Sequence, residues 1–201
     1  MKTRLFLSFV SLVVLGAIAG CDDSQNPLSD PQKAKADAKL LGTWRYQDHD
    51  GNVSYYHIGH AGENLPEGVL RVVAATHHAD GKLTSGEHML FASTVGGSTY
   101  LNITDGKAGQ VQALEENGWD ATQIDGYFLY KYELKADTLC VQGIDRDAKR
   151  RAIEGKRLKG TVEPGDDGKV KFTDSTENLA RFVAEAKDLF AKDVERLQRV
   201  K

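Results

Sequence analysis

The chain has 201 residues, of which 26 are basic and 29 acidic, so its formal net charge at pH 7 is −3. This length suits one domain with a single hydrophobic core. Because the charges are interspersed and their sum is slightly acidic, the composition argues against a nucleic acid as the partner.

The first twenty residues have the layout of a secretory signal. Lys2 and Arg4 give a positive start, and an apolar run over residues 5–18 is followed by small residues. That run is shorter than the about 20 apolar residues that a membrane-crossing helix needs. We therefore predict that residues 1–20 are a cleaved signal peptide rather than a transmembrane helix.

The end of this leader, Ile18-Ala19-Gly20-Cys21, resembles the lipobox of bacterial lipoproteins. The resemblance implies that Cys21 becomes the mature N-terminus and carries a diacylglycerol with palmitate-type chains. Several acyl chains anchor a protein firmly where one chain does not. Asp22 resembles the signal for retention in the inner membrane, so we expect a lipid anchor on the periplasmic face of that membrane rather than in the outer membrane. An ordinary cleaved signal and an uncleaved anchor are the alternatives.

Residues 21–39 are rich in Asp, Ser, Pro, Lys and Ala, with almost no large apolar side chain. Such a composition cannot bury enough surface to fold alone. We predict a lipidated N-terminus and flexible tether over 21–39, with a short helix over 33–39 as an alternative, and a single β-rich domain over 40–201. Removal of the leader takes away two basic residues, which leaves 24 basic and 29 acidic residues and a net charge of −5.

Residues 40–104 carry the turn signals of consecutive β-hairpins. Asp50-Gly51, Asp80-Gly81 and Gly96-Gly97 separate apolar or alternating runs, and these dipeptides accept the positive φ angles of tight turns. The expected strands cover residues 40–46, 53–58, 69–76, 88–94 and 99–103. This pattern predicts an antiparallel up-and-down meander.

Residues 105–125 are more polar, with a short helix expected over 110–116, and strand character returns at 127–134. Alternate residues there form one apolar face, with Lys131 and Glu133 on the other: Phe128, Tyr130, Tyr132 and Leu134. A turn at Ala136-Asp137 leads to another strand over 138–144.

A short helix is expected from Asp145, which can cap it, to Ile153, with Gly155 just beyond its end. After a strand over 170–173, the chain is expected to finish with a helix over about 174–200, because Asp174 and Glu177 resemble a capping box. Its apolar stripe is Leu179, Phe182, Val183, Ala186, Leu189, Phe190, Val194 and Leu197. We interpret the stripe as the face that covers the sheet; a surface for a partner helix or the membrane is the alternative.

Gly42-Thr43-Trp44, at the start of the first strand of a meander, resembles the opening motif of the lipocalins. In that family the tryptophan plugs one end of an up-and-down barrel. The arginine that stacks on it in the family is not identifiable in this sequence. The resemblance implies a mainly β fold, a lipocalin-like barrel or half-barrel covered by a C-terminal helix, and it transfers no ligand residues.

Cysteine and histidine offer two further hypotheses. With Cys21 acylated, Cys140 has no disulfide partner, and its apolar surroundings predict a small buried side chain rather than a reactive thiol. All six histidines lie between residues 49 and 88. A metal site could form across strands from His57, His77 and His88. The preferred interpretation is solvated histidines near turns, so no metal and no cofactor is expected.

No catalytic motif was found, including the Gly-x-Ser-x-Gly, His-Glu-x-x-His, phosphate-loop and dinucleotide patterns, so an enzyme is not expected. Two hypotheses remain. The barrel binds a small apolar or amphipathic ligand, lined by aromatic residues of the strands at 55–58 and 127–134, or the protein is an accessory lipoprotein that docks an envelope protein complex. A cavity of several hundred Å³ with convergent polar groups favours binding, and a filled interior with an exposed apolar patch favours docking.

Overall fold

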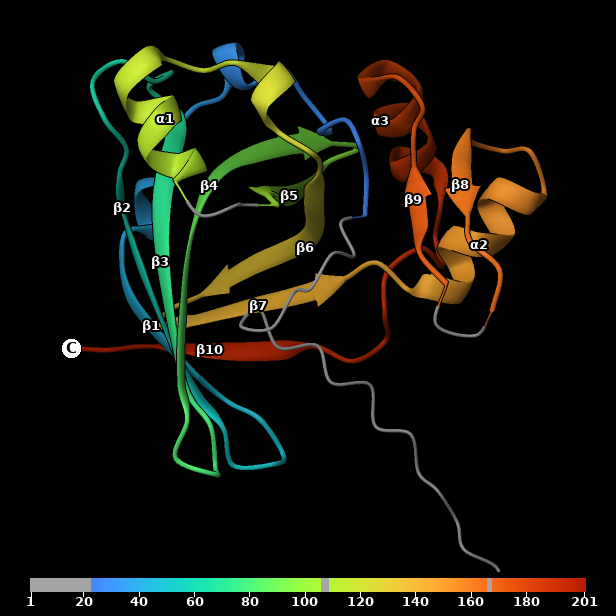
Figure 1. The fold of residues 1–201 in the computed structure, drawn as a ribbon. Coiled ribbons are helices and arrows are strands. Elements are labelled where there is room, and N and C mark those ends of the chain that lie inside the picture. The colour runs from blue at the N-terminus through green and yellow to red at the C-terminus, as the bar shows by residue number, and fades with distance from the viewer. Residues whose placement is uncertain (1–22, 106–108, 166–167) are drawn as a thin grey trace, which may run out of the picture.

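The computed structural model describes residues 23–105, 109–165 and 168–201, whose arrangement Figure 1 shows. Eight strands close into one antiparallel barrel in which sequence neighbours pair and the last strand lies between the first and the seventh. The strands are β1 (Gly42–Gln47), β2 (Val53–His60), β3 (Val69–His77), β4 (Leu83–Val95), β5 (Ser98–Thr104), β6 (Tyr127–Lys135), β7 (Thr138–Gly143) and β10 (Glu195–Arg199). The predicted up-and-down meander is confirmed.

The hairpin turns lie at the positions that the glycine-containing dipeptides predicted. Gly51 and Gly81 have φ angles of 84° and 87° in the β1–β2 and β3–β4 turns, a region that costs glycine little. The barrel curves chiefly along β4, which is 13 residues long. Its first part pairs with β3 from Leu83 to Phe91, and its last part pairs with β5 from Leu90 to Val95. One strand thus joins the two walls of the barrel.

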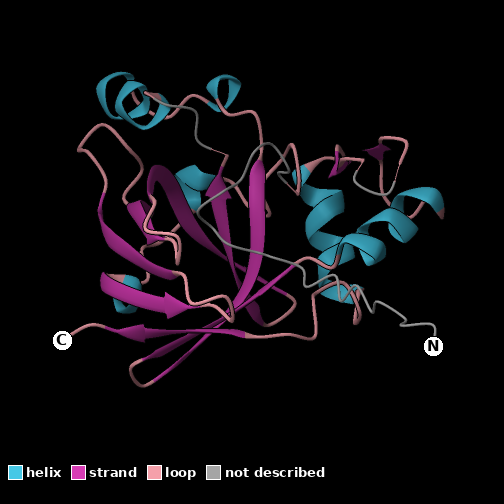
Figure 2. Cartoon of the chain, turned by 60° about the horizontal axis from the view of Figure 1, so that its bottom comes forward, coloured by secondary structure: helices cyan, strands magenta, loops and turns pink. Residues whose placement is uncertain are grey.

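Between β7 and β10 the chain forms a separate layer, residues 144–194, which we call the insert. It contains α2 (Arg146–Glu154), β8 (Gly160–Val162), β9 (Val170–Phe172) and α3 (Thr176–Glu185). The helix expected after Asp145 is confirmed, because the Asp145 carboxylate accepts a hydrogen bond from the Ala148 N–H at 2.7 Å. Figure 2 shows the helices of the insert gathered on one flank of the barrel.

Two apolar cores result from this arrangement. One fills the barrel and includes Trp44, Leu90 and Leu197. The other lies outside it, where Met89 and Phe91 of β4 point away from the barrel axis and are fully buried. The helix α1 (Gln110–Asn117), which forms where the sequence predicted a short helix, the insert and the N-terminal segment cover this outer face.

The N-terminal segment corrects one prediction. The backbone N–H groups of Asp23 and Ser24 donate to the Tyr127 carbonyl at 2.9 and 3.0 Å. Leu28 is only 2 % exposed, and its N–H donates to the Asn102 side chain at 2.7 Å. The predicted flexible tether over 21–39 is therefore wrong for residues 23–39. The apolar content of the segment is low, but one buried leucine and satisfied backbone groups dock it on the barrel.

In place of one helix over 33–39, this segment forms two short 3-10 turns, Pro31–Lys33 and Ala38–Leu40. A third such turn, Ala121–Gln123, precedes β6. Within the described ranges, no helix combines the length and apolarity needed to cross a membrane.

The predicted helix near the C-terminus is confirmed, but its predicted extent over 174–200 is wrong beyond Glu185. The helix α3 begins one residue later than expected, with Ser175 as its cap, and ends at Glu185. The chain then turns and finishes as the strand β10, with Leu197 inside the barrel and Arg196 and Gln198 exposed. The apolar positions from 194 to 200 fit a strand as well as a helix, and barrel closure decides between them. The first part of the stripe does cover the sheet, because Leu179 lies in the outer core.

Candidate functional site

The barrel interior holds a narrow cavity of about 40 Å³. This volume accommodates a few water molecules at most, against about 300–1,000 Å³ for a typical small-molecule pocket. The barrel is therefore filled mainly by its own side chains. The cavity is lined by Tyr56, Ile58, Val72, Ala74, His88, Leu90, Leu101, Ile103, Tyr130, Leu139, Val141 and Leu197.

The interior becomes polar toward the end of the barrel at which β1 ends and β10 begins. Ser54 and Thr76, facing each other across β2 and β3, are 1 % exposed, and their hydroxyl oxygens lie 2.8 Å apart. Burial raises the pKa of Tyr46 at the end of β1, and the negative charge of Glu195 raises it further. Glu195, the first residue of β10, thus lies beside this polar layer.

Glu195 is the unusual group of the interior. It pairs in register with Val141 and lies two residues before Leu197, so the alternation of the strand turns its side chain inward. Burial raises the pKa of its carboxyl group to about 7. No hydrogen bond or nearby positive charge counteracts this rise, and within residues 23–105, 109–165 and 168–201 no basic side chain lies within ion-pair distance of it.

Two tyrosine hydroxyls share the environment of Glu195. Burial raises the pKa of Tyr56 and of Tyr130 well above the ordinary value, and the Glu195 carboxylate contributes to both shifts. Both phenols are therefore neutral throughout the physiological range and can donate or accept a hydrogen bond. The cavity is lined by the two neutral phenols, and the Glu195 carboxylate lies beyond its lining, near enough to affect both phenols. Such an arrangement can hold a small molecule that has an apolar part and a polar or positively charged end.

The opposite end of the barrel is closed. Trp44 is fully buried, and its indole N–H donates to the Leu40 carbonyl at 2.7 Å. The Arg199 guanidinium lies over the Trp44 ring at 4.1 Å from its centroid and donates to the Leu41 carbonyl at 2.6 Å. Arg199 thus stacks on Trp44, a contact that the sequence did not reveal. Trp44 and Arg199 therefore plug this end of the barrel.

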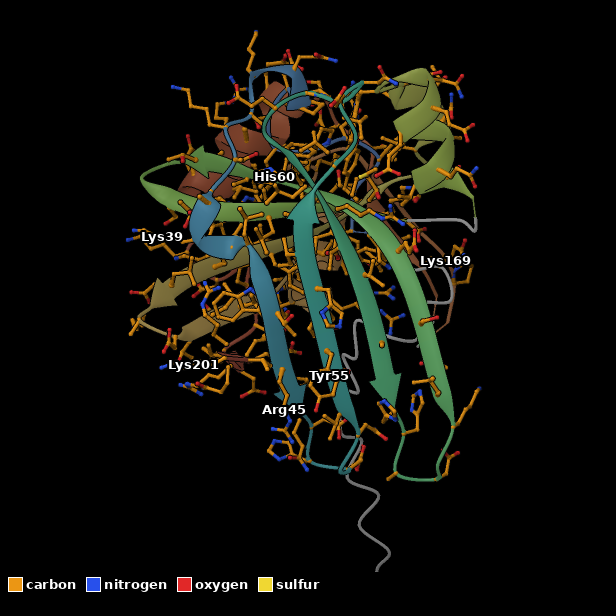
Figure 3. All side chains as sticks on the ribbon, turned by 90° about the vertical axis from the view of Figure 1, so that its left-hand side faces the viewer. Lys39, Arg45, Tyr55, His60, Lys169 and Lys201 are labelled. Carbon is orange, nitrogen blue, oxygen red and sulfur yellow. The ribbon has the colours of Figure 1, made fainter. Side chains whose placement is uncertain are left out.

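The two strand segments that were expected to line the barrel do so in part. Tyr56 and Tyr130 point inward as predicted, whereas Tyr55 lies on the outer surface, opposite Arg45 in register (Figure 3). Glu195 was missed because its segment was expected to be helical. The available signal was the alternation of Glu195, Leu197 and Arg199 with polar residues between them.

The three histidines of the metal hypothesis are not brought together. The ring of His57 is on the exposed outer surface, with Nδ1 2.9 Å from the Thr43 hydroxyl, and His77 is exposed at the end of β3. His88 faces the cavity, and its Nδ1 lies 2.9 Å from the Thr104 carbonyl oxygen. Among all residues that the structure describes, no group of three or more His, Cys, Asp or Glu side chains is placed to hold a metal ion.

Of the two cysteines, only Cys140 lies among the residues that the structure describes. Cys140 is half-buried on the outer side of β7, between Glu133 of β6 and Arg196 of β10, which corrects the prediction of a buried side chain. Strand alternation explains the difference, because its neighbours Leu139 and Val141 take the inner positions. Cys21 and the leader lie outside the described residues.

Two open grooves lie on the insert, on either side of Phe182. One of about 460 Å³ is bordered by Arg151, Arg157 and Lys187 but also by two acidic side chains, and one of about 360 Å³ is similarly mixed in charge. Neither groove has the apolar lining and convergent polar groups of a ligand pocket. The Glu195 end of the barrel is therefore the candidate functional site.

No protein-family model, curated protein or solved structure matches this chain. The fold and the site accordingly rest on the geometry described above.

Proposed function

We propose that this chain is an envelope lipoprotein, anchored through acylated Cys21, whose barrel binds one small amphipathic molecule at the Glu195 end. The observation that carries the binding proposal is the desolvated Glu195 carboxylate, which lies near enough to the buried phenols of Tyr56 and Tyr130 to raise their pKa and has no ion-pair or hydrogen-bond partner among the described residues. The proposal includes no catalytic step.

The cost of burying such a group supports a ligand. An ionised carboxylate taken out of water without a partner destabilises the folded state. In a barrel that serves only as a scaffold, an apolar side chain at position 195 would avoid this cost. A ligand with a hydrogen-bond donor or a positive charge would compensate the carboxylate, and strongly perturbed groups of this kind concentrate at functional sites.

The size of the cavity limits the ligand. With about 40 Å³ free, only a short apolar group enters unless interior side chains move. The polar end of the ligand would then remain near Tyr46 and Glu195, where the barrel meets water. A short alkylamine has this form.

An accessory lipoprotein that docks an envelope complex is the second candidate, and the nearly filled interior favours it. The exposed apolar patch that such a role predicts is not supported by the described residues, because only Leu83 and Val200 are large, apolar and exposed there. They belong to the β4 start and the chain end, so they are single positions rather than a patch.

Paired titrations test the binding proposal. Propylamine and propanol have equal, short apolar parts, so calorimetry with both isolates the contribution of the charged end. We expect the amine to bind at least about tenfold more tightly than the alcohol, and Glu195→Gln to abolish the difference, since tenfold corresponds to about 1.4 kcal/mol. The matched control is Glu133→Gln, because Glu133 lies on the outer side of β6 and is 63 % exposed. Equal affinity for amine and alcohol in the parent protein would contradict the proposal.

Fractionation tests the anchor separately. Cys21→Ser is expected to move the protein from the membrane fraction to the soluble fraction, and mass analysis of the parent is expected to show an acylated residue 21. An unmodified thiol at that position would overturn the anchor and leave the ligand site unaffected.

A further inference from the structure

Positive charge is concentrated in one short part of the insert. Residues 146–159 contain seven basic and two acidic side chains, a net charge of +5. The mature chain expected from Cys21 carries −5, so everything outside this segment sums to −10. A local excess of this size within an acidic protein indicates a surface for an anionic partner.

Six of the seven basic side chains are available at the surface, five of them exposed and Arg150 half-buried. We call them the basic ridge: Arg146, Arg150, Arg151, Lys156, Arg157 and Lys159. Within the described part of the chain, no carboxylate lies within ion-pair distance of any of them. Figure 1 shows α2, which supplies the first three, on the outer flank of the molecule. Acidic side chains lie nearby, with Glu185 and Asp188 in the groove that Arg151 and Arg157 border and Asp174 near Lys159. None of them forms an ion pair with the ridge, which therefore keeps an excess of positive charge.

The seventh basic residue ties the N-terminal segment to this place. The Lys149 ammonium lies 2.7 Å from the Asp23 carboxylate, and the two side chains are only 6 % and 15 % exposed. On a helix, residues three positions apart are neighbours, so Arg146 lies on the same side as Lys149, and Arg150 follows directly. The chain thus joins the domain next to the basic ridge.

Covalent geometry brings Cys21 to the same place. Only Asp22 separates Cys21 from Asp23, so their Cα atoms are two extended steps apart, at most about 7 Å. Since residues 23–39 are docked on the barrel, they supply no slack. With the Asp23 side chain and its 2.7 Å contact to Lys149 added, an acylated Cys21 in the membrane would hold the Lys149 ammonium within about one to two Debye lengths of the headgroups, each about 8 Å at physiological salt.

We propose that the basic ridge lies against the anionic phospholipid headgroups of the membrane that holds Cys21. The inference deepens the proposed function, because it rests on the lipid anchor and adds the orientation of the domain. Clusters of Lys and Arg next to a membrane anchor bind anionic lipids in this way. The barrel stands beside the insert, so its ligand-binding end is held at a fixed place relative to the membrane rather than on a loose tether.

Vesicle binding of the unacylated protein tests this surface. The probe is the mature chain with Cys21→Ser, mixed with vesicles of phosphatidylcholine alone or of phosphatidylcholine with phosphatidylglycerol. At about 0.1 M salt, where the Debye length is about 10 Å, we expect at least tenfold stronger sedimentation with the anionic vesicles. Raising the salt is expected to remove the preference.

Charge reversal locates the surface. Arg150→Glu together with Arg151→Glu is expected to weaken anionic-vesicle binding about a hundredfold or more, since each basic side chain contributes several-fold. The matched control is Lys39→Glu with Lys82→Glu, which changes the net charge equally at exposed positions on the barrel and should keep binding within about threefold. Thermal unfolding measures whether both variants are folded. If the charge-reversal variant does not fold, Arg150→Gln together with Arg151→Gln replaces it in the test.

Two results overturn the proposal: equal binding to neutral and anionic vesicles, or an equal loss of binding in the control variant. Both are independent of acylation, because the probe carries no lipid. Mass analysis of residue 21 decides the anchor itself, so failure of the surface and failure of the anchor are distinguishable.

Discussion

In the proposed site, Glu195 would serve binding at the expense of stability. The residue is half-buried, and desolvation alone accounts for the raised pKa of about 7 of its carboxyl group. Sites of this kind commonly reduce the stability of the fold, and substitutions that relieve them stabilise the protein while they remove the activity. Stability and ligand affinity are therefore expected to change in opposite directions at position 195.

The pH dependence of stability follows from the direction of this shift. In the unfolded chain the carboxyl group titrates near 4.5, and in the folded chain near 7. Between these values the folded protein keeps a proton that the unfolded chain has lost, so the contribution of this group to stability is lost as the pH rises through this window. A difference of about 2.5 pH units corresponds to about 3 kcal/mol, and partial exposure reduces this to about 2 kcal/mol.

Glu195→Gln should therefore be about 2 kcal/mol more stable than the parent at pH 8 and equally stable at pH 4. Urea denaturation at both pH values measures this difference. Glu133→Gln, which alters an exposed carboxylate, should show no such pH dependence. If Glu195→Gln were less stable than the parent at pH 8, the carboxylate would have a structural partner, and the argument for a ligand would fail.

At the scale of elements, the closed end of the barrel joins the first and last strands. Trp44 and Arg199 are register partners across β1 and β10, and the guanidinium lies over the indole ring. These strands share only two partner pairs, the second being Arg45 with Gln198. The side-chain stack and the hydrogen bonds to the preceding backbone therefore hold the seam of the barrel together.

Weakening this seam should destabilise the barrel. Arg199→Lys retains the charge but loses the planar group that stacks and donates to the Leu41 carbonyl, so we expect a loss of about 1–3 kcal/mol in the free energy of unfolding. Trp44→Phe also loses the bond to the Leu40 carbonyl and should cost a similar amount. Guanidinium denaturation of both variants measures these losses. A change on the outer side of the same strand, Arg45→Lys at a half-buried position, should have almost no effect.

The elements also show which parts of the fold local sequence determines. Hairpins with Asp-Gly turns and the helix capped by Asp145 were predicted because their signals lie within a few residues. The identity of β10 was not, since Leu197 fits both periods and only pairing with β1 and β7, far away in the sequence, selects the strand. Glu195 was missed for the same reason, because its side chain points into the barrel only if residues 195–199 form a strand.

At the scale of the whole molecule, the stability of the barrel depends on the insert and the N-terminal segment that pack on its outer face. Its outer face carries Met89, Phe91 and Leu129, all fully buried, so the face would be an apolar surface if the insert and the N-terminal segment were absent. Ser24 bridges the two layers directly, since it pairs with Tyr127 of the barrel and with Phe172 of the insert. We infer that the barrel, the insert and residues 23–39 unfold as one unit.

This unity predicts the effect of N-terminal truncation. A chain that begins at residue 40 loses the burial of Leu28, worth about 2 kcal/mol, and leaves Lys149 as a buried charge without its partner, which typically costs about 3–5 kcal/mol. Together these terms approach the whole stability of a typical domain. Compared with a chain that begins at Asp23, the shorter chain should unfold at least about 10 °C lower in a calorimetric scan.

Lys149→Met in both chains separates the two causes. In the shorter chain it removes the isolated charge and should recover part of the loss. In the longer chain it removes the cation paired with Asp23, which keeps only the hydrogen bond from the Leu129 N–H, and should destabilise. If Lys149→Met raises the unfolding temperature of the shorter chain and lowers that of the longer chain, the Asp23–Lys149 pair is the connection between the N-terminal segment and the insert. Equal unfolding temperatures for the two unsubstituted chains would instead mean that residues 23–39 behave as the tether that their composition suggests.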